Sequence, residues 1–324
     1  MIRIAIVGAG GIGKTHIDNL AEISFAKITD ICDSDPRAAQ TAQKLGASFY
    51  DNLEEMLAVS EAQVVLICTP TFLHYEQISA VLRGKRYCIS EKPLCLSSDQ
   101  ARELFELADQ NGVQLYVAHV LHFWEEYALL ADLIKTNAYG AVIDAYFYRL
   151  TQLPAWTAGG WMFERKKSGL LPYDLHIHEL DFIVSLFGSP KRFNVQSGGS
   201  KNASYKEYYR IAYEFENLSV CAEASWYNAP IPFTQGFRVY FEKGLVMFDG
   251  KTMTAYEQNQ SPRILSRQDE QKSISTSINV TSTTAYLNEL SHFLTCAEKN
   301  TPSNKVSCEQ IIATLKVLEA LEEN

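Results

Sequence analysis

A glycine-rich turn between a short apolar run and a helical stretch most restricts the fold of this 324-residue chain. The run Ile2–Val7 leads directly into the turn, and a helical pattern follows it. In such a turn the first glycine permits a tight bend, the second lets the backbone approach a pyrophosphate, and the third lets helix and strand pack closely. The helix N-terminus adds free N–H groups and a favourable dipole. The residues predicted to bind a dinucleotide here are Gly8, Gly10, Gly11, Ile12 and Gly13.

Asp33 lies at the distance from this turn at which a dinucleotide site has an acidic residue. It ends the second predicted strand, 20 residues after Gly13, where a carboxylate can bind ribose hydroxyls. Its charge would repel a 2′-phosphate and so favours NAD, whereas Arg37 is close enough in sequence to approach that phosphate. The alternative role for Asp33 is a helix cap, for which Ser34 and Asp35 are equally suitable. NAD is the predicted cofactor, with NADP as the alternative.

The first 120 residues alternate short β-branched runs with helical segments, which indicates βαβ units on a parallel sheet. The predicted strands are Ile2–Val7, Lys27–Cys32, Val64–Cys68, Arg86–Ile89 and Val113–Ala118. The predicted helices are Lys14–Glu22, Pro36–Leu45, Leu53–Val59, Leu73–Arg83 and Asp99–Asn111. Three glycines follow helical patterns, where a C-terminal cap calls for positive φ: Gly46, Gly84 and Gly112.

After residue 120 the pattern changes to an α/β region with an antiparallel sheet. The expected elements are a helix at Phe123–Lys135, a strand at Ala141–Leu150, an apolar helix at Pro172–Phe187, and alternating strands from Arg192 to about Met253 joined by short turns. A polar stretch at Gln258–Thr284 reads as a loop or ragged strand edge, and helices at Thr284–Glu298 and Ser307–Glu323 close the chain. We therefore predict a dinucleotide-binding domain at 1–120 and a substrate-binding and oligomerisation domain at 121–324.

Two polar segments follow the fourth and fifth predicted strands of the first domain. Thr69 and Pro70, with His74 after them, follow one strand, and Glu91-Lys92-Pro93 follows the next. Ligands bind at the carboxyl ends of the strands in an open parallel sheet. A lysine there can polarise a carbonyl or relay a proton, although an isolated lysine after a strand is more often simply solvated.

A second candidate for acid/base chemistry lies on the apolar helix. Helical spacing places Asp174, His178 and Asp181 along one face and His176 roughly opposite. A carboxylate beside an imidazole can orient it for proton transfer. The alternative is that Asp174 interacts with the helix dipole and His178 is a core histidine. Because residues i and i+2 do not converge on a helix, a metal site at His176 and His178 is not expected.

Composition excludes several classes of protein. The formal net charge of −9 and the lack of a long basic run argue against a nucleic-acid binder. No apolar run is long enough for a membrane helix, and the first residues lack the pattern of a signal peptide. The seven cysteines are odd in number and form no C-x-x-C pair. We therefore expect a cytoplasmic protein without a structural metal or a disulfide framework.

Taken in order, these motifs resemble the glucose-fructose oxidoreductase / inositol dehydrogenase (Gfo/Idh/MocA) family, over essentially the whole chain. Beyond the glycine turn and Asp33, the matching segments are Cys68-Thr-Pro-Thr-Phe-Leu-His74, Gly84-Lys-Arg-Tyr-Cys-Ile-Ser-Glu-Lys-Pro93, Ser168-Gly169 with Asp174-x-x-x-His178, and Tyr286-Leu-Asn-Glu-Leu-Ser-His-Phe293. The Glu-Lys-Pro element is the most specific of these matches.

The resemblance implies a Rossmann domain followed by an α/β domain with a large open, mostly antiparallel sheet, through which members form homodimers or homotetramers. It implies an NAD(P)-dependent oxidoreductase acting on a carbinol carbon of a sugar, cyclitol or related polyol. Lys92 resembles the catalytic lysine, His178 the acid/base, and Asp174 its partner or a second substrate contact. Glu91 and Pro93 resemble residues that shape the backbone of this lysine near the nicotinamide, which implies that Glu91 and Lys92 lie at the cofactor. Thr69, Pro70 and His74 resemble the segment that lines the cofactor site.

Some residues depart from the family pattern. Leu170 stands where a second glycine is usual, His176 where glycine is frequent, and His122 where arginine or asparagine is frequent. Trp161, in a glycine-rich loop, is a candidate platform for a sugar ring, with core packing as the alternative. Arg149 is a candidate substrate contact, with a salt bridge as the alternative. His122 is a third candidate for the substrate site.

Two other functions remain open for a chain of this kind. One is a non-catalytic sensor that uses the dinucleotide domain to report ligand or redox state, although a sensor has no need of Lys92, Asp174 and His178. The other is an NAD-assisted glycosidase of the same architecture, in which oxidation is transient.

Overall fold

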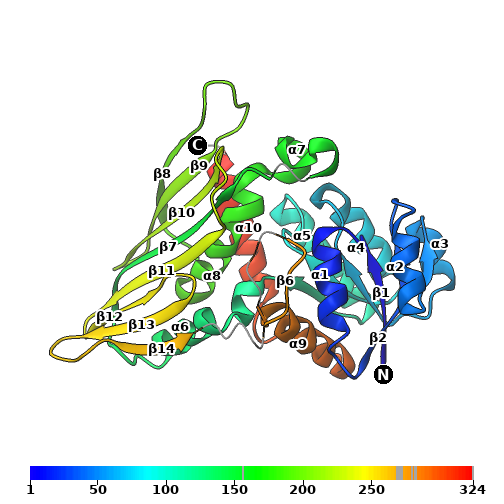
Figure 1. Ribbon diagram of the computed structural model, residues 1–324, viewed down its shortest axis with the longest axis horizontal. Coiled ribbons are helices and arrows are strands. Elements are labelled where there is room, and N and C mark those ends of the chain that lie inside the picture. The colour runs from blue at the N-terminus through cyan, green and yellow to red at the C-terminus, as the bar shows by residue number, and fades with distance from the viewer. Residues whose placement is uncertain (155–156, 268–272, 279, 281–282, 323–324) are drawn as a thin grey trace. The chain divides into compact units, whose positions relative to one another are not determined.

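The structure is a computed structural model that describes residues 1–154, 157–267, 273–278, 280 and 283–322. The chain divides into two compact units (Figure 1). One comprises Met1–Val120 with Lys272–Ile312, and the other comprises Leu121–Gln271 with Ala313–Asn324. The domain limits expected from the sequence stay a prediction, and the structure groups a C-terminal segment with the first unit.

The first unit contains a six-stranded sheet in which all recorded strand pairs are parallel. Its strands are β1 (Ile2–Val7), β2 (Ala26–Cys32), β3 (Ser48–Tyr50), β4 (Val64–Ile67), β5 (Tyr87–Glu91) and β6 (Leu115–Ala118). Their order, β3-β2-β1-β4-β5-β6, reverses direction between β1 and β4, which is the point where ligands bind in a doubly wound fold. The predicted Rossmann domain is confirmed. Strand β3 was not predicted.

The helices of this unit begin and end where the local sequence allows. They are α1 (Gly11–Leu20), α2 (Ala38–Leu45), α3 (Leu53–Val59), α4 (His74–Arg83), α5 (Ser98–Asn111) and α9 (Ala285–Lys299), with a short 3-10 helix at Thr71–Leu73. Ser97 caps α5, and its hydroxyl accepts hydrogen bonds from two backbone N–H groups of the first turn. Helix α9, distant in sequence, packs beside α1 (Figure 1).

All three predicted glycines follow the ends of their helices, but one lacks the expected positive φ. Gly46 and Gly112 have φ of 65° and 71°, as a left-handed cap requires. Gly84 has φ of −73°, and the left-handed residue after α4 is Lys85, with φ of 54°. The left-handed residue therefore lies one position beyond the glycine that caps α4.

The second unit contains an eight-stranded sheet. Its strands are β7 (Val142–Gln152), β8 (Arg192–Gly198), β9 (Tyr208–Glu214), β10 (Ser219–Tyr227), β11 (Thr234–Phe241), β12 (Gly244–Phe248), β13 (Thr252–Glu257) and β14 (Arg263–Arg267). The order is β14-β13-β12-β11-β7-β10-β9-β8, and of the recorded pairs only β7 with β10 is parallel. The predicted open, mostly antiparallel sheet is confirmed, and β14 lies within the stretch that was read as a loop or ragged edge.

The second unit also contains helices, of which α10 is shared with the first unit because the division falls after Ile312. They are α6 (Glu125–Lys135), α7 (Arg165–Ser168), α8 (Ile177–Phe187) and α10 (Cys308–Glu322), with 3-10 helices at Val120–Phe123 and Ala158–Phe163 and a π-helix at Pro172–His176. Phe147 of β7 and Phe237 of β11 are buried and pack against each other and on Phe182 of α8 and Tyr127 of α6, which gives a buried aromatic core.

The opposite face of the sheet, which we call the outer face, carries large apolar side chains in the open. They come from four adjacent strands: Tyr240, Met247, Tyr256 and Ile264. Their exposed fractions range from 37% to 46%.

Candidate functional site

The glycine turn after β1 has the geometry predicted for close backbone approach. Gly8 has φ of 91°, and a Cβ there would lie 2.8 Å from the carbonyl carbon of Cys68. A Cβ on Gly13 would lie 2.0 Å from the carbonyl oxygen of Gly8, so a side chain would force α1 away from β1. A Cβ on Gly10 would meet nothing within 4 Å. Two glycines therefore serve packing, and the third leaves the backbone open to a ligand.

The N-terminus of α1 is suited to an anion. Its N-cap is Gly10, no side chain caps it, and its first turn has no acidic residue. The N–H groups of the first turn, including those of Gly11 and Ile12, thus keep the positive end of the helix dipole available. Ser277, whose backbone N–H donates to the Thr15 hydroxyl at 2.9 Å, lies beside this turn. The residues present fit the pyrophosphate of a dinucleotide.

Asp33 follows β2, is half-buried, and orients the glycine turn itself. Its Oδ2 accepts the N–H of Ala9 at 2.7 Å, and its Oδ1 accepts the N–H of Asp35 at 2.8 Å. A carboxylate has about four acceptor positions, so lone pairs remain for ribose hydroxyls. Hydrogen bonds from Arg37 lower the pKa of the exposed Asp35 to about 2. Arg37, the residue that could approach a 2′-phosphate, is therefore already paired with Asp35.

Thr69, Pro70 and His74 follow β4 at the same edge of the sheet. The Thr69 hydroxyl donates to the side chain of Gln77 at 2.5 Å, and Thr69 and Pro70 are half-buried. His74 begins α4 and is 1% exposed, with both ring nitrogens near backbone carbonyl oxygens. Its side chain thus contacts the loops around the site, and a direct contact with cofactor stays a prediction.

Glu91 ends β5, and Lys92 follows it. Glu91 is buried, with Oε1 2.7 Å from Nε2 of His16 on α1 and Oε2 accepting the N–H of Lys92 at 3.1 Å. Burial acts to raise the pKa of Glu91, but the hydrogen bond and charge of His16, together with Lys92, hold it below its usual value. Both carboxylate oxygens are therefore fixed, and the backbone of Lys92 with them. The Lys92 side chain is half-buried.

A second buried carboxyl lies in the same unit. Glu289 on α9 is fully buried, and neither of its oxygens has a recorded hydrogen-bond partner in the described part of the chain. Burial and the nearby charge of Glu91 raise its pKa well above the usual value. The pKa values of these two buried carboxyl groups are therefore shifted in opposite directions.

In the second unit, Asp174 and His178 lie in the segment for which the sequence predicts one α-helix at Pro172–Phe187. That prediction of a single α-helix is wrong. Pro172–His176 forms a π-helix, and α8 begins at Ile177. The wider π turn changes the angle between Asp174 and His178 that the spacing of an α-helix implies, and π turns are frequent at functional sites. Both side chains are half-buried, and each has interactions within the protein.

Two positions that depart from the family pattern affect the backbone and the core. Leu170 has φ of 60°, directly after Gly169 with φ of 70°, so a leucine occupies a left-handed conformation that glycine adopts without strain. His176 is fully buried, and its Nε2 lies 2.6 Å from the Tyr213 hydroxyl. Burial lowers the pKa of His176 to about 3. His176 therefore belongs to the core as a neutral ring.

The three candidate substrate contacts differ in their surroundings. Arg149 is 3% exposed and donates to both oxygens of Glu179 at 2.9 Å, which is the arrangement of the salt-bridge alternative. His122 lies with Nε2 2.7 Å from Oδ2 of Asp181, also buried. Trp161 is half-buried in the 3-10 helix at Ala158–Phe163. Contact of any of these with a substrate stays a prediction.

Each unit contains some of the predicted site residues. The glycine turn, Asp33, Thr69 and Lys92 follow β1, β2, β4 and β5 and so share the carboxyl edge of one sheet, while Asp174 and His178 belong to the second unit. Sequence reasoning missed His16 and Glu289. Helical spacing places both on the buried faces of α1 and α9, and Glu289 also lies within the Tyr286–Phe293 segment that resembles the family.

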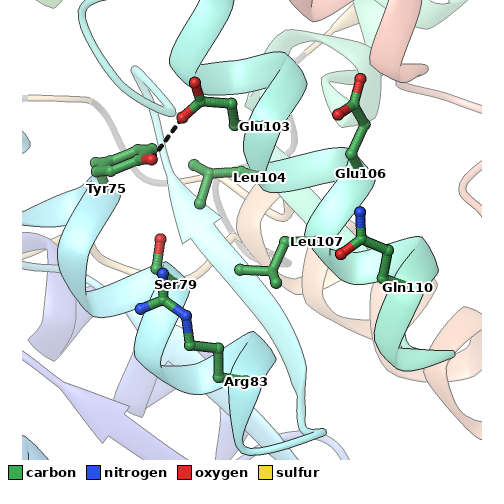
Figure 2. Close-up of a pocket in the computed structure, with 8 residues that line it drawn as sticks. All are labelled: Tyr75, Ser79, Arg83, Glu103, Leu104, Glu106, Leu107 and Gln110. Carbon is green, nitrogen blue, oxygen red and sulfur yellow. Dashed lines mark hydrogen bonds between the residues drawn. The ribbon is translucent and has the colours of Figure 1, made fainter.

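No three His, Cys, Asp or Glu side chains in the described ranges gather as a metal ion would require. No helix in the described part of the chain has both the length and the apolar character of a membrane span. Figure 2 shows a groove between α4 and α5, where Tyr75 donates to Glu103 at 2.5 Å. None of the predicted site residues lines this groove.

Comparison with known proteins gives the same architecture. Residues 2–119 match the oxidoreductase family with an NAD-binding Rossmann fold, and residues 127–247 match the GFO/IDH/MocA C-terminal domain. An uncharacterized oxidoreductase of Streptococcus pneumoniae is 28% identical over 200 residues, which are 62% of this chain and 54% of that protein. D-glucoside 3-dehydrogenase of Escherichia coli is 29% identical over 194 residues, which are 58% of this chain and 55% of that protein.

The chain spans about half the length of the curated relatives it matches. A solved structure of levoglucosan dehydrogenase, in complex with NADH and levoglucosan, superposes with a TM-score of 0.84 at 16% identity and covers 99% of this chain and 96% of that one. This likeness shows the shared fold. The chain belongs to the Gfo/Idh/MocA oxidoreductase family, with the NAD-binding Rossmann domain followed by the family's C-terminal domain.

Proposed function

We propose that this protein is an NAD-dependent oxidoreductase that transfers a hydride between nicotinamide and a carbinol carbon of a sugar, cyclitol or related polyol. The observation that carries the proposal is the carboxyl edge of the parallel sheet, where the uncapped N-terminus of α1, Asp33 and Lys92 all follow strands beside the reversal in strand order. Relatives named D-glucoside 3-dehydrogenase and levoglucosan dehydrogenase support the substrate class.

A bound nicotinamide dinucleotide supplies the hydride acceptor or donor. The chain's residues supply binding, alignment and proton transfer. The N–H groups at the start of α1 hold the pyrophosphate, and Asp33 accepts hydrogen bonds from ribose hydroxyls. In the oxidative direction His178, oriented by Asp174, accepts the hydroxyl proton of the substrate, and the ammonium of Lys92 donates a hydrogen bond to the reacting oxygen.

The outer face supports a homodimer or homotetramer. Tyr240, Met247, Tyr256 and Ile264 would be covered by the same sheet of a second copy, which would remove four exposed apolar side chains from water.

The deciding experiment measures binding and turnover separately. The purified protein is titrated with NADH and with NADPH by fluorescence, and then incubated with NAD and a panel of sugars, cyclitols and polyols while absorbance reports NADH. We expect tighter binding of NADH and NADH formation with at least one member of the panel.

Other outcomes identify the alternatives. Equal affinity for NADPH contradicts the preference for NAD. Tight NADH binding with no hydride transfer across the panel supports the sensor, and sugar release from a glycoside without net NADH supports the NAD-assisted glycosidase. A wild-type protein that binds neither dinucleotide contradicts the proposed cofactor site.

A further inference from the structure

The ring of His74 lies between the two loops that form the carboxyl edge of the sheet. His74 is the first residue of α4 and is 1% exposed. Its Nε2 is 2.8 Å from the carbonyl oxygen of Thr69, just beyond β4. Its Nδ1 is 2.8 Å from the carbonyl oxygen of Pro93, just beyond Lys92. One side chain therefore contacts both the segment expected to line the cofactor and the segment that carries Lys92.

The number of protons on the His74 ring limits which of its two contacts can be hydrogen bonds. A carbonyl oxygen accepts hydrogen bonds and cannot donate, so each contact is a hydrogen bond only if the ring nitrogen carries the proton. A neutral imidazole has one N–H group and an imidazolium has two. With one proton, the bare nitrogen would set its lone pair against a carbonyl lone pair at hydrogen-bond distance. Both contacts are favourable only in the doubly protonated ring.

The charges around the ring act in opposite directions. Burial has the largest effect and lowers the pKa of His74 below its usual value; the carbonyl oxygens of Thr69 and Pro93 and the charge of Glu91 act to raise it, and the charge of Lys92 acts to lower it. Glu91 is itself held ionised by His16, so a carboxylate is available to balance a cation on His74.

We propose that His74 is a positioning residue that donates hydrogen bonds from both ring nitrogens and so holds the loop after β4 and the Glu91–Pro93 segment in fixed relation. The proposal rests on the proposed function, which assigns the loop after β4 to cofactor binding and the Glu91–Pro93 segment to catalysis through Lys92. The hydrogen bond to Thr69 stabilises the cofactor-lining loop. The hydrogen bond to Pro93 stabilises the backbone that presents Lys92.

The first test uses the wild-type protein and needs no substrate. In protein labelled with ¹⁵N-histidine, the ring nitrogens of His74 are observed by long-range ¹H–¹⁵N correlation, with His74→Phe to assign the signals. We expect two protonated nitrogens in mildly acidic solution, because burial lowers the pKa of the ring and its second proton binds only below the usual value. A single protonated nitrogen would overturn the double donation, whether or not the protein binds NADH.

The second test separates the hydrogen bond to Thr69 from the hydrogen bond to Pro93. The amide nitrogen of asparagine lies about as far from Cα as Nδ1, and that of glutamine about as far as Nε2. His74→Asn thus keeps a donor for Pro93 and loses the one for Thr69, and His74→Gln does the reverse. We expect His74→Asn to weaken NADH binding about tenfold, the effect of losing one buried hydrogen bond, with kcat nearly unchanged. We expect His74→Gln to lower kcat about tenfold with NADH affinity nearly unchanged.

The matched control is Tyr75→Phe, the next residue of α4, which removes the hydrogen bond to Glu103 without touching either loop (Figure 2). It should leave both NADH affinity and kcat as in the wild type. If His74→Asn and His74→Gln lower both quantities equally, or alter only the melting temperature, His74 has a general structural role and the proposal is wrong. Turnover is measured with the panel member that the wild type oxidises. A wild-type protein that binds no NADH contradicts the proposed function, whereas the labelling experiment still decides whether His74 donates from both ring nitrogens.

Discussion

The Nε2 atom of His16 lies 2.7 Å from Oε1 of Glu91, and this pair connects α1, which begins at the glycine turn, to the residue before Lys92. The His16 side chain is fully buried and that of Glu91 is 9% exposed. A buried carboxylate that loses its partner is strongly destabilising, because the remaining charge has neither water nor a donor. This pair therefore joins the stability of the fold to the placement of the candidate catalytic lysine.

Replacing His16 should expose that dependence. We expect His16→Ala to lower the free energy of unfolding by about 3–5 kcal/mol at neutral pH, as measured by urea denaturation. Because the folded-state pKa of Glu91 is depressed, its stabilising effect is present above the unfolded pKa and is lost as pH falls through the folded value. The difference between the two proteins should therefore shrink in acid. The control is Asp18→Ala, on the exposed side of α1, and an equal loss there would contradict the assignment.

Glu289 should show the opposite dependence on pH. Its pKa is raised in the folded state, so the folded protein keeps a proton that the unfolded chain releases, and stability falls as pH rises above the unfolded value. We expect Glu289→Gln to gain stability relative to wild type, by up to about 1.4 kcal/mol per pH unit above pH 5. Urea denaturation at three pH values measures it. Glu298→Gln, exposed on the same helix, should show no such slope, and a flat difference for Glu289→Gln would refute a raised pKa.

Lys92 should be required for turnover and dispensable for cofactor binding. We expect Lys92→Ala to lower kcat by about 10²–10⁴-fold, the usual contribution of a positioned proton-transfer group, while the dissociation constant for NADH stays nearly unchanged. Steady-state kinetics and fluorescence titration measure the two quantities. Lys44→Ala, at an exposed site on α2, is the control. Wild-type turnover in Lys92→Ala would remove Lys92 from the proposed mechanism.

Asp33 should determine the choice between the two dinucleotides. We expect Asp33→Ser to weaken NADH binding about tenfold through loss of a charged acceptor and to strengthen NADPH binding by removing a repulsive charge. Fluorescence titration with each cofactor gives the ratio. Asp109→Asn removes one carboxylate from the exposed C-terminal part of α5 and should leave that ratio unchanged. An unchanged ratio in Asp33→Ser would show that other residues select the cofactor.

The outer face should decide assembly. We expect Met247→Glu to convert the oligomer to a monomer, because a carboxylate in an apolar interface loses its hydration without gaining a partner. Sedimentation velocity measures the change, and circular dichroism confirms that the fold is retained. Lys251→Glu, in the turn between β12 and β13, is the control. A wild-type protein that sediments as a monomer would contradict assembly through this face.

The sequence was informative where local signals are strong. The glycine turn and the helices after it follow from glycine positions and apolar periodicity, so the parallel domain was predictable. Strand β3, Ser48–Tyr50, is three residues long and exists because it pairs with β2. Strand β14 likewise forms in a polar stretch through pairing with β13. Short edge strands carry little pattern of their own, which is why β3 was not predicted and β14 was placed only within a stretch that could be a loop or a ragged strand edge.

In the candidate site, too, some features could be predicted from the sequence and others could not. The types and order of Asp33, Lys92 and His178 are visible in the sequence because each follows a recognisable element. The partners that hold them are not, since His16 contacts a carboxylate 75 positions away and His74 contacts two backbone carbonyl oxygens. Main-chain acceptors leave no trace in residue identity. The strained backbone at Leu170 was also hidden, because a leucine signals no positive φ.

Strand β7 has a consequence for how the second sheet comes into being. Strands β8–β10 form one antiparallel run and β11–β14 another, each joined by neighbours in sequence, and β7 alone pairs with both. The two runs can assemble early from nearby segments, but the single sheet exists only once β7, translated before either, is inserted between β10 and β11. Such distant pairings make folding slow. Until that insertion, each half presents an unpaired strand edge open to another chain.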